Sequence, residues 1–163
     1  MEKFDKKIGY VGIGNMGGAI AQYLARVEFD LTVYDVRPEA MEPFAANGTK
    51  TAGSLKELVD AVDYIMICVE DDYKLIKLVT EADGILTYAR KGQVIIIQST
   101  CKISTARQIE KAAAAKGVLV IDAPVSGNFE DRNNGTLGVY VGGAKETVEL
   151  CRPIINAIGA EGK

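Results

Sequence analysis

The chain has 163 residues, of which 48% are hydrophobic and 25% charged, and this mixture suits one compact domain with its own core. Its net charge is −3 and no stretch concentrates lysine and arginine, so we expect neither nucleic acid nor a membrane surface as partner. The chain contains no histidine, which excludes mechanisms that need a histidine base or a histidine zinc ligand.

Strand-like and helix-like patterns alternate along the chain. The predicted strands are residues 7–12, 31–34, 64–69, 94–97, 119–122 and 136–141. The predicted helices are residues 16–27, 38–47, a short one after a capping-box pattern at 54–57, 73–79, 104–116 and 145–158. This alternation predicts an α/β, Rossmann-type doubly wound, mainly parallel sheet in a single domain over residues 1–163.

The N-terminal segment and the cysteines favour a reducing compartment. Residues 1–7 are charged and lack the apolar core of a signal peptide, and no apolar run approaches the roughly 18 residues that span a bilayer. Cys68, Cys101 and Cys151 are odd in number and widely spaced, which favours free thiols over a disulfide framework. We therefore expect a cytoplasmic protein, without a membrane partner or a metal site.

A glycine-rich segment joins the first predicted strand to the first predicted helix, with the spacing Gly-x-Gly-x-x-Gly. The first glycine permits a tight turn, the second lets a pyrophosphate approach the backbone, and the third lets the helix pack closely on the sheet. Free N–H groups at the helix N-terminus would bind the phosphates. The residues expected to contact a dinucleotide here are Gly12, Ile13, Gly14, Asn15, Met16 and Gly17.

An acidic residue at the end of the second strand completes this pattern. Asp35 lies 18 residues after Gly17, where a carboxylate accepts hydrogen bonds from the adenosine ribose. The same carboxylate would repel a 2′-phosphate, so we expect NAD, with NADP as the alternative. Val36 and Arg37 belong to the same predicted site. Arg37 either stacks on the adenine or pairs with a 2′-phosphate, or it is a solvated residue near a helix start.

The ends of the third and fourth strands should face the same crevice, because cofactors lie across the carboxyl ends of such sheets. Val69, Glu70 and Asp71 follow the third strand and are expected to contact the cofactor, although a helix dipole alone also explains acidic residues before a helix. Ser99 and Thr100 follow the fourth strand. Their hydroxyls are placed either to contact the nicotinamide ribose or to cap a turn.

With these residues the sequence resembles the β-hydroxyacid dehydrogenase family, which includes 3-hydroxyisobutyrate dehydrogenase and is related to 6-phosphogluconate dehydrogenase. The segment IGYVGIGNMGG is similar to the family's cofactor fingerprint, and DAPVSG at residues 122–127, followed by GTLGVYVGG, is similar to its substrate segment. The resemblance covers nearly the whole chain. It implies that Ser126, Gly127 and Asn128 hold a substrate carboxylate through hydroxyl and backbone N–H groups.

Three departures from the family concern this substrate side. Asn128 replaces the second glycine of the family's SGG, residues 130–132 replace a small Gly-Ala pair, and the segment after Ser99 lacks the family's proline. They leave the cofactor segment unchanged and put the identity of the substrate in doubt.

The resemblance also implies what the chain does and what it lacks. Family members oxidise a 3-hydroxy acid reversibly with NAD(P), using a lysine at the start of an all-helical second domain. No matching segment precedes Lys163, so we expect the second domain to be absent, no catalytic residue in this chain, and little activity from it alone. A hydroxy acid substrate and a homodimer are expected of the whole enzyme.

Two other functions remain open. One is a stand-alone dinucleotide-binding module without catalysis. The other is an NADP-dependent enzyme that acts on a sugar-acid phosphate, for which only Arg132 in residues 122–143 supplies a basic side chain.

Overall fold

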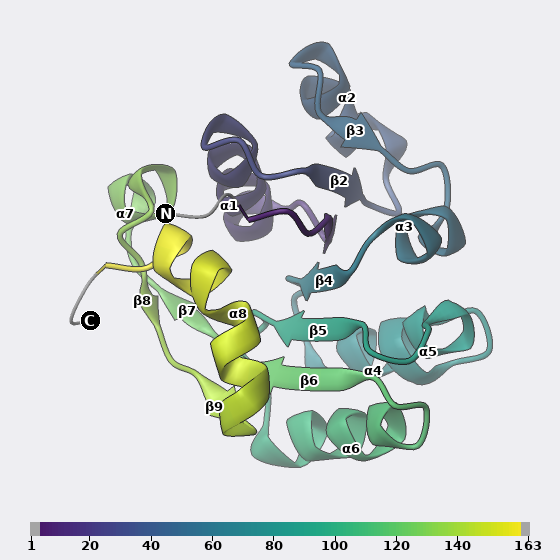
Figure 1. Ribbon diagram of the computed structural model, residues 1–163. Helices are drawn as coiled ribbons and strands as arrows, with labels where there is room; N and C mark the ends of the chain where they lie inside the picture. Colours follow the sequence, from purple (N-terminus) through teal and green to yellow (C-terminus); the bar gives the residue numbers. More distant parts are fainter. Residues whose placement is uncertain (1–3, 161–163) are drawn as a thin grey trace.

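A computed structural model describes residues 4–160 (Figure 1), so both ends of the domain predicted over 1–163 lie outside the described residues. The strands are β1 (Ile8–Val11), β2 (Leu31–Tyr34), β3 (Lys50–Thr51), β4 (Tyr64–Ile67), β5 (Val94–Ile97), β6 (Leu119–Asp122), β7 (Val125–Ser126), β8 (Gly138–Val139) and β9 (Gly142–Gly143). The helices are α1 (Asn15–Arg26), α2 (Pro38–Ala46), α3 (Leu55–Ala61), α4 (Asp72–Thr80), α5 (Ile85–Tyr88), α6 (Ile103–Ala114), α7 (Phe129–Asn134) and α8 (Lys145–Ile158).

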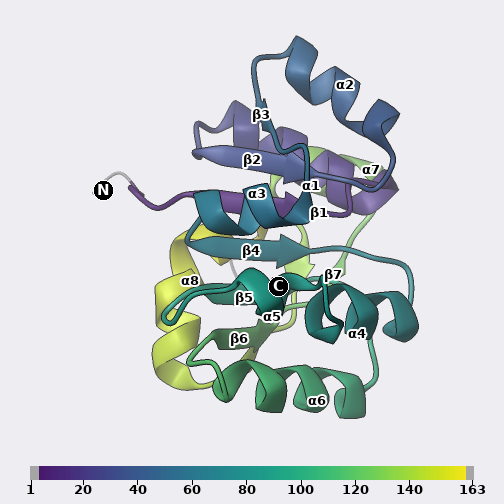
Figure 2. The same ribbon diagram turned by 90° about the vertical axis from the view of Figure 1, so that its right-hand side faces the viewer.

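Parallel strands make up most of the central sheet, in the order β3-β2-β1-β4-β5-β6, and β9 adds an antiparallel edge beside β6. The chain builds outward from β1 in one direction and then from β4 in the other, so the switch of direction lies between these two neighbours. Figure 2 shows β1, β2 and β4 pointing the same way. The predicted fold class is confirmed, and the carboxyl ends of β1 and β4 lie where such sheets bind ligands.

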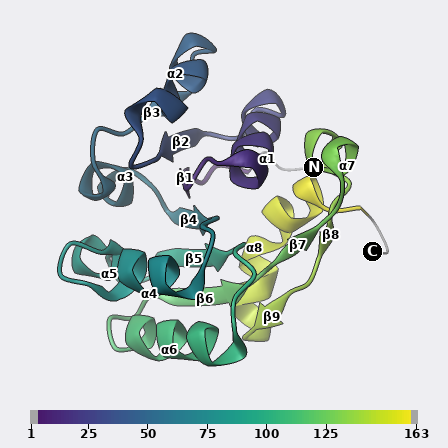
Figure 3. The same cartoon turned by 180° about the vertical axis from the view of Figure 1, so that it is seen from behind.

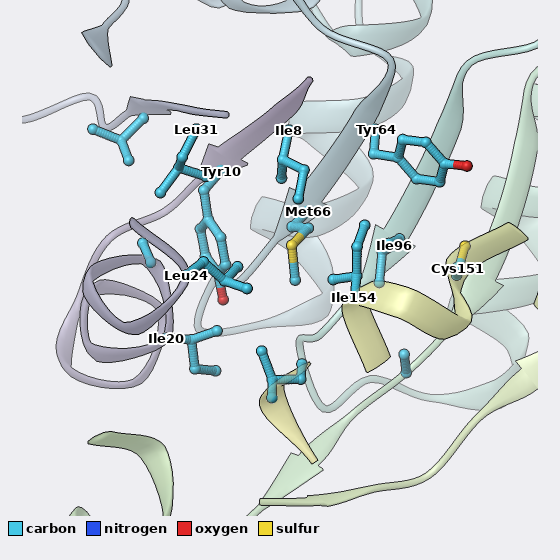
Figure 4. Close-up of a cluster of buried hydrophobic side chains, with 14 of the residues drawn as sticks. Ile8, Tyr10, Ile20, Leu24, Leu31, Tyr64, Met66, Ile96, Cys151 and Ile154 are labelled. Carbon is cyan, nitrogen blue, oxygen red and sulfur yellow. The ribbon is translucent and has the colours of Figure 1, made fainter. Parts of the chain in front are cut away.

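Helices cover both faces of the sheet, and each face has its own apolar core. Met66 and Ile96 face the core under α1, α2 and α8, whereas Ile65 and Ile95 face the core under the helices from α3 to α6. Successive residues of a strand point to opposite faces, which explains why β4 and β5 are apolar throughout. Figure 4 shows the first core, in which Ile154 of α8 lies beside Met66 and Ile96.

Local sequence signals set several helix boundaries. Pro38 occupies the first turn of α2, as predicted, and Gly48 follows that helix with a φ of 79°. The Ser54 hydroxyl accepts the Glu57 N–H at 3.1 Å and begins α3. The Glu57 carboxylate accepts the N–H of Gly53, at 2.9 Å, where a capping box would use that of Ser54. The capping-box pattern therefore predicted the start of α3, but only one of the two hydrogen bonds of a capping box is formed.

The C-terminal third differs most from the predicted elements. The single strand expected over 136–141 is instead β8, paired antiparallel with β7, followed by β9, paired antiparallel with β6. The predicted strand is divided because Leu137 is buried and forms a β-bridge with Gly159, just after α8. The segment therefore pairs with the end of α8 before the chain returns to the sheet as β9. The sequence did not predict β3, α5, β7, α7 or β9. The other element boundaries differ by one or two residues, a normal difference for element ends.

Candidate functional site

The turn between β1 and α1 is built from glycines with different roles. Gly12 has a φ of 85°, and a Cβ there would collide with the backbone carbonyl oxygen of Cys68 at the end of β4. A Cβ at Gly17 would collide with the carbonyl oxygen of Gly12, so this glycine sets how closely α1 approaches the turn. Gly14 differs, because a Cβ at that position would meet no atom within 4 Å. Its missing side chain leaves open space beside the backbone.

The N-terminus of α1 is suited to an anion. Gly14 is the N-cap residue and supplies no side-chain cap, and the first turn contains no acidic residue. The first N–H groups of a helix have no partner within the helix, and the helix dipole adds a partial positive charge there. α1 has 12 residues and begins at the switch point of the sheet. A phosphate group placed over Gly14 would therefore meet backbone donors without steric hindrance.

Asp35, at the end of β2, is buried, and its carboxylate already has protein partners. It accepts the N–H of Ile13 at 3.0 Å, and the N–H and Nε–H of Arg37 at 3.0 and 3.1 Å. Burial alone would raise the pKa of this carboxyl, but the hydrogen bonds from Arg37 and Ile13 outweigh burial and lower that pKa. Asp35 thus ties the second strand to the glycine turn. Arg37 is folded onto Asp35 rather than simply solvated, while Val36 is strongly exposed.

Hydrogen bonds link the residues that follow β4 and β5 at the carboxyl edge of the sheet. The N–H of Val69 donates to the Ser99 hydroxyl at 2.8 Å, which links the ends of β4 and β5. Asp71 accepts the Lys74 N–H at 2.7 Å as the N-cap of α4, and Glu70 pairs with the Lys74 ammonium. Asp71 therefore has a structural role as the N-cap of α4, at the helix end where the dipole favours acidic residues. Thr100 is exposed at the same edge, so its expected contact with the cofactor stays a prediction.

The loop after β6 is closed by its own hydrogen bonds. The Asn128 side-chain oxygen accepts the N–H groups of Glu130 and Asp131, at 2.8 and 3.1 Å, and the Asn128 N–H donates to the Asp131 carboxylate at 3.0 Å. This reciprocal capping box begins α7. Two of the residues expected at a substrate carboxylate, Ser126 and Gly127, are exposed beside it. The Asn128 N–H is occupied by a carboxylate of the chain itself.

The helix α7 brings this loop to the cofactor turn, which sequence reasoning missed. In Figures 1 and 3, α7 lies beside α1. A guanidinium nitrogen of Arg132, Nη1, donates to the carbonyl oxygen of Asn15 at 3.2 Å, and the Arg26 guanidinium donates to the carbonyl oxygen of Asn133. The signal for α7 was present as an Asn-x-x-Asp capping pattern before a left-handed Gly135, with φ 68°.

The thiols near these segments are protonated at neutral pH. Burial, with a smaller contribution from the carboxylates of Asp122 and Asp72, raises the pKa of the Cys101 thiol to about 11. Burial raises the pKa of Cys151 to about 12 and also raises that of Cys68. A thiol is a nucleophile only as the thiolate, so the structure supplies no activated cysteine among these three.

Membrane-spanning helices, metal-binding clusters and hollows are the other features that could bind a ligand or a membrane. Within residues 4–160, no helix is long and apolar enough to cross a membrane, and no group of acidic and cysteine side chains is placed to hold a metal ion. A hollow of about 520 Å³ lies at the opposite end of α1, next to Phe29, Leu31 and Phe44. It lies away from the glycine turn, where the open space at Gly14 makes the N-terminus of α1 the candidate binding surface.

Together, the strand order, the glycine turn at the switch point and the acidic residue after β2 define a dinucleotide-binding domain of the Rossmann class. Sequence comparison agrees with this class. Residues 7–162 match the family described as "NAD binding domain of 6-phosphogluconate dehydrogenase", and the chain belongs to this family.

Similar proteins are oxidoreductases about twice as long. The chain is 36% identical over 143 residues, 88% of its length, to an uncharacterised oxidoreductase of Mycobacterium tuberculosis, of which this covers 48%. It is 32% identical to an NAD-dependent L-serine dehydrogenase of Pseudomonas aeruginosa, covering 94% of this chain and 52% of that protein. A solved 3-hydroxyisobutyrate dehydrogenase of Mycobacterium tuberculosis superposes with a TM-score of 0.88 at 28% identity, over 95% of this chain and 52% of that chain. The chain thus spans about half the length of the relatives it matches.

Proposed function

We propose that this domain, predicted over residues 1–163, is the dinucleotide-binding half of an NAD-dependent dehydrogenase that oxidises a 3-hydroxy acid. The observation that carries the proposal is the open backbone at Gly14, where an uncapped helix N-terminus meets the switch point of the sheet. A pyrophosphate fits both the space and the positive end of α1. The nicotinamide, when bound, supplies the hydride acceptor, and the residues of this chain bind and orient it.

The expected cofactor contacts beyond the turn remain part of this proposal. Asp35 is buried and both of its carboxylate oxygens are engaged by Ile13 and Arg37, so an adenosine ribose over β2 would reach the carboxylate where the exposed Arg37 side chain gives way. The proposal favours NAD, because a 2′-phosphate would have to draw Arg37 away from Asp35 and leave that carboxylate beside a second negative group. Arg37 is exposed and can move at small cost, which keeps NADP as the alternative.

The substrate side is proposed with one amendment. Ser126 and Gly127 remain accessible for a substrate carboxylate, whereas the Asn128 N–H is engaged by Asp131. A hydroxy acid would therefore either displace the Asp131 carboxylate from that N–H or bind through Ser126 and Gly127 alone. The resemblance to the β-hydroxyacid dehydrogenase family implies a proton-transferring lysine in a second domain, and we propose that it lies outside the 163 residues described by this sequence.

Calorimetric titration of the 163-residue chain with NAD⁺ and NADP⁺ tests the cofactor assignment. We expect measurable binding of both, with NAD⁺ preferred. Gly14→Ala should weaken binding, because its methyl group enters the space beside the phosphate donors. Gly142→Ala is the matched control, because a Cβ there also meets no atom within 4 Å but lies on the edge strand β9. The absence of binding by the unsubstituted chain, or equal losses in both variants, would contradict the assignment.

The assignment of catalysis has a separate test. The 163-residue chain should produce no NADH from 3-hydroxyisobutyrate or L-serine above the uncatalysed rate, since it contributes no acid–base residue. Steady turnover at an ordinary enzymatic rate would show that a catalytic group is present within these residues.

A further inference from the structure

Arg132 is held in an unusual position at the start of α1. Its Nη1 donates to the carbonyl oxygen of Asn15, the first residue of that helix, at 3.2 Å. Its guanidinium carbon lies 4.9 Å from the centre of the Phe129 ring, a cation–π contact within α7. Its Nε is enclosed and has no hydrogen-bond partner among the described residues. A guanidinium with an unsatisfied buried donor is thus fixed within one residue of the glycine turn.

The charges at the start of α1 favour an anion. The N-terminus of α1 carries the positive end of the helix dipole, and its first turn contains no acidic side chain. A guanidinium at the same end adds like charge, whereas cations normally stabilise the opposite end of a helix. An anion over Gly14 would be attracted by both the helix end and Arg132.

We propose that Arg132 is a cofactor-binding residue that contributes a positive charge to the dinucleotide pyrophosphate from α7. The inference rests on the proposed function and adds to it a contact from outside the glycine turn. A guanidinium offers five N–H donors in a planar fork, so the bond to Asn15 leaves others for a phosphate oxygen.

The position also links the two halves of the site. Arg132 and Asn128 lie on α7 and at its N-cap, so a dinucleotide that engages Arg132 holds the loop after β6 against α1. Bound NAD⁺ should therefore slow amide hydrogen exchange in residues 128–135. A residue with a structural role only would give the same exchange with and without the nucleotide.

The test is calorimetric titration with NAD⁺ at several salt concentrations, using the unsubstituted chain, Arg132→Met and Arg132→Lys. Methionine keeps an apolar stem against Phe129 and removes the charge, and we expect it to weaken binding about tenfold, the loss expected for one charge-assisted hydrogen bond. Lysine keeps the charge and should recover part of that loss. Arg107→Met, on the exposed side of α6, is the matched control and should bind normally.

Each outcome decides between the two proposals. Weaker binding with a flatter salt dependence in Arg132→Met, partly recovered in Arg132→Lys, supports the contact, because screening weakens only interactions between charges. Unchanged affinity and salt dependence in Arg132→Met would overturn it while the proposed function stands. No binding by the unsubstituted chain would overturn both. If Arg132→Met unfolds, as circular dichroism would show, Arg132→Lys decides: affinity and NAD⁺-dependent exchange protection equal to those of a neutral Arg132→Gln variant would also overturn the contact.

Discussion

Two turns at the same edge of the sheet contrast in how they use their polar groups. The β1–α1 turn leaves open space beside Gly14 at the N-terminus of α1, which has no side-chain cap, while its Ile13 N–H is bound to Asp35. The β6–α7 loop satisfies its donors internally, through the reciprocal bonds of Asn128 and Asp131. An anion can bind the first without rearrangement, whereas it must compete with a carboxylate in the second. The proposed cofactor side is therefore preorganised, whereas the proposed substrate side must release Asp131 from the Asn128 N–H before that donor can bind a ligand.

The largest effect should come from the turn itself. Gly12→Ala places a methyl group against the Cys68 carbonyl at a φ of 85°, and neither backbone can move without disturbing β1 or β4. We expect a loss of about 3 kcal/mol or more in the free energy of unfolding, from backbone strain plus overpacking. Urea unfolding followed by circular dichroism measures it.

Gly14→Ala is the control for this substitution. Its φ of −68° and ψ of −159° suit any residue, and the new methyl group would meet nothing within 4 Å. Its free energy of unfolding should change by less than about 1 kcal/mol, while its affinity for NAD⁺ falls. Equal destabilisation of both variants would show that the turn is not built from glycines with separate roles.

The difference between the turns also explains which parts could be predicted from sequence. Backbone sterics require glycine at positions of the first turn, and burial on both faces requires apolar residues throughout β4 and β5. A local sequence pattern is therefore enough to predict the turn and these two strands. The strands β7, β8 and β9 depend on pairing between distant residues, such as the bridge from Leu137 to Gly159, which no local pattern contains. The helix α7 buries no residue completely and is set by polar caps, so apolar periodicity could not reveal it. The contact from Arg132 to Asn15 crosses 117 positions of sequence.

A middle-sized effect should follow from Asp35→Asn, which removes the charge that fixes the glycine turn to β2. We expect a loss of about 1–2 kcal/mol at pH 7, because charge-assisted bonds from Ile13 and Arg37 are weakened. The folded-state pKa is lowered, so the carboxylate stabilises the fold above its unfolded pKa of about 3.9 and loses that contribution as pH falls through the folded value. The free energies of unfolding of the two proteins should therefore differ at pH 7 and approach each other as the pH falls below about 3.9.

Arg37→Met separates the side-chain ion pair of Asp35 from its bonds to the backbone N–H groups of residues 13 and 37. It removes the partly exposed ion pair but keeps the Ile13 N–H, so its cost should be about 0.5 kcal/mol. A cost equal to that of Asp35→Asn would place the whole stabilisation in the ion pair. The bond from the Ile13 N–H to the Asp35 carboxylate would then contribute nothing measurable to the stability of the turn.

The smallest effect on global stability is expected in the loop that Asn128 and Asp131 close. Asn128→Ala removes the acceptor for two N–H groups at the start of α7, which costs about 1 kcal/mol for a lost N-cap. Because α7 buries no residue completely, the loss should be local: amide exchange in residues 129–134 should accelerate about fivefold while the global unfolding transition stays unchanged. Asn128→Asp keeps an acceptor and should leave exchange near that of the unsubstituted chain. If Asn128→Ala instead lowers the global stability, α7 is part of the cooperative fold, and opening this loop for a substrate would require more than the release of its cap.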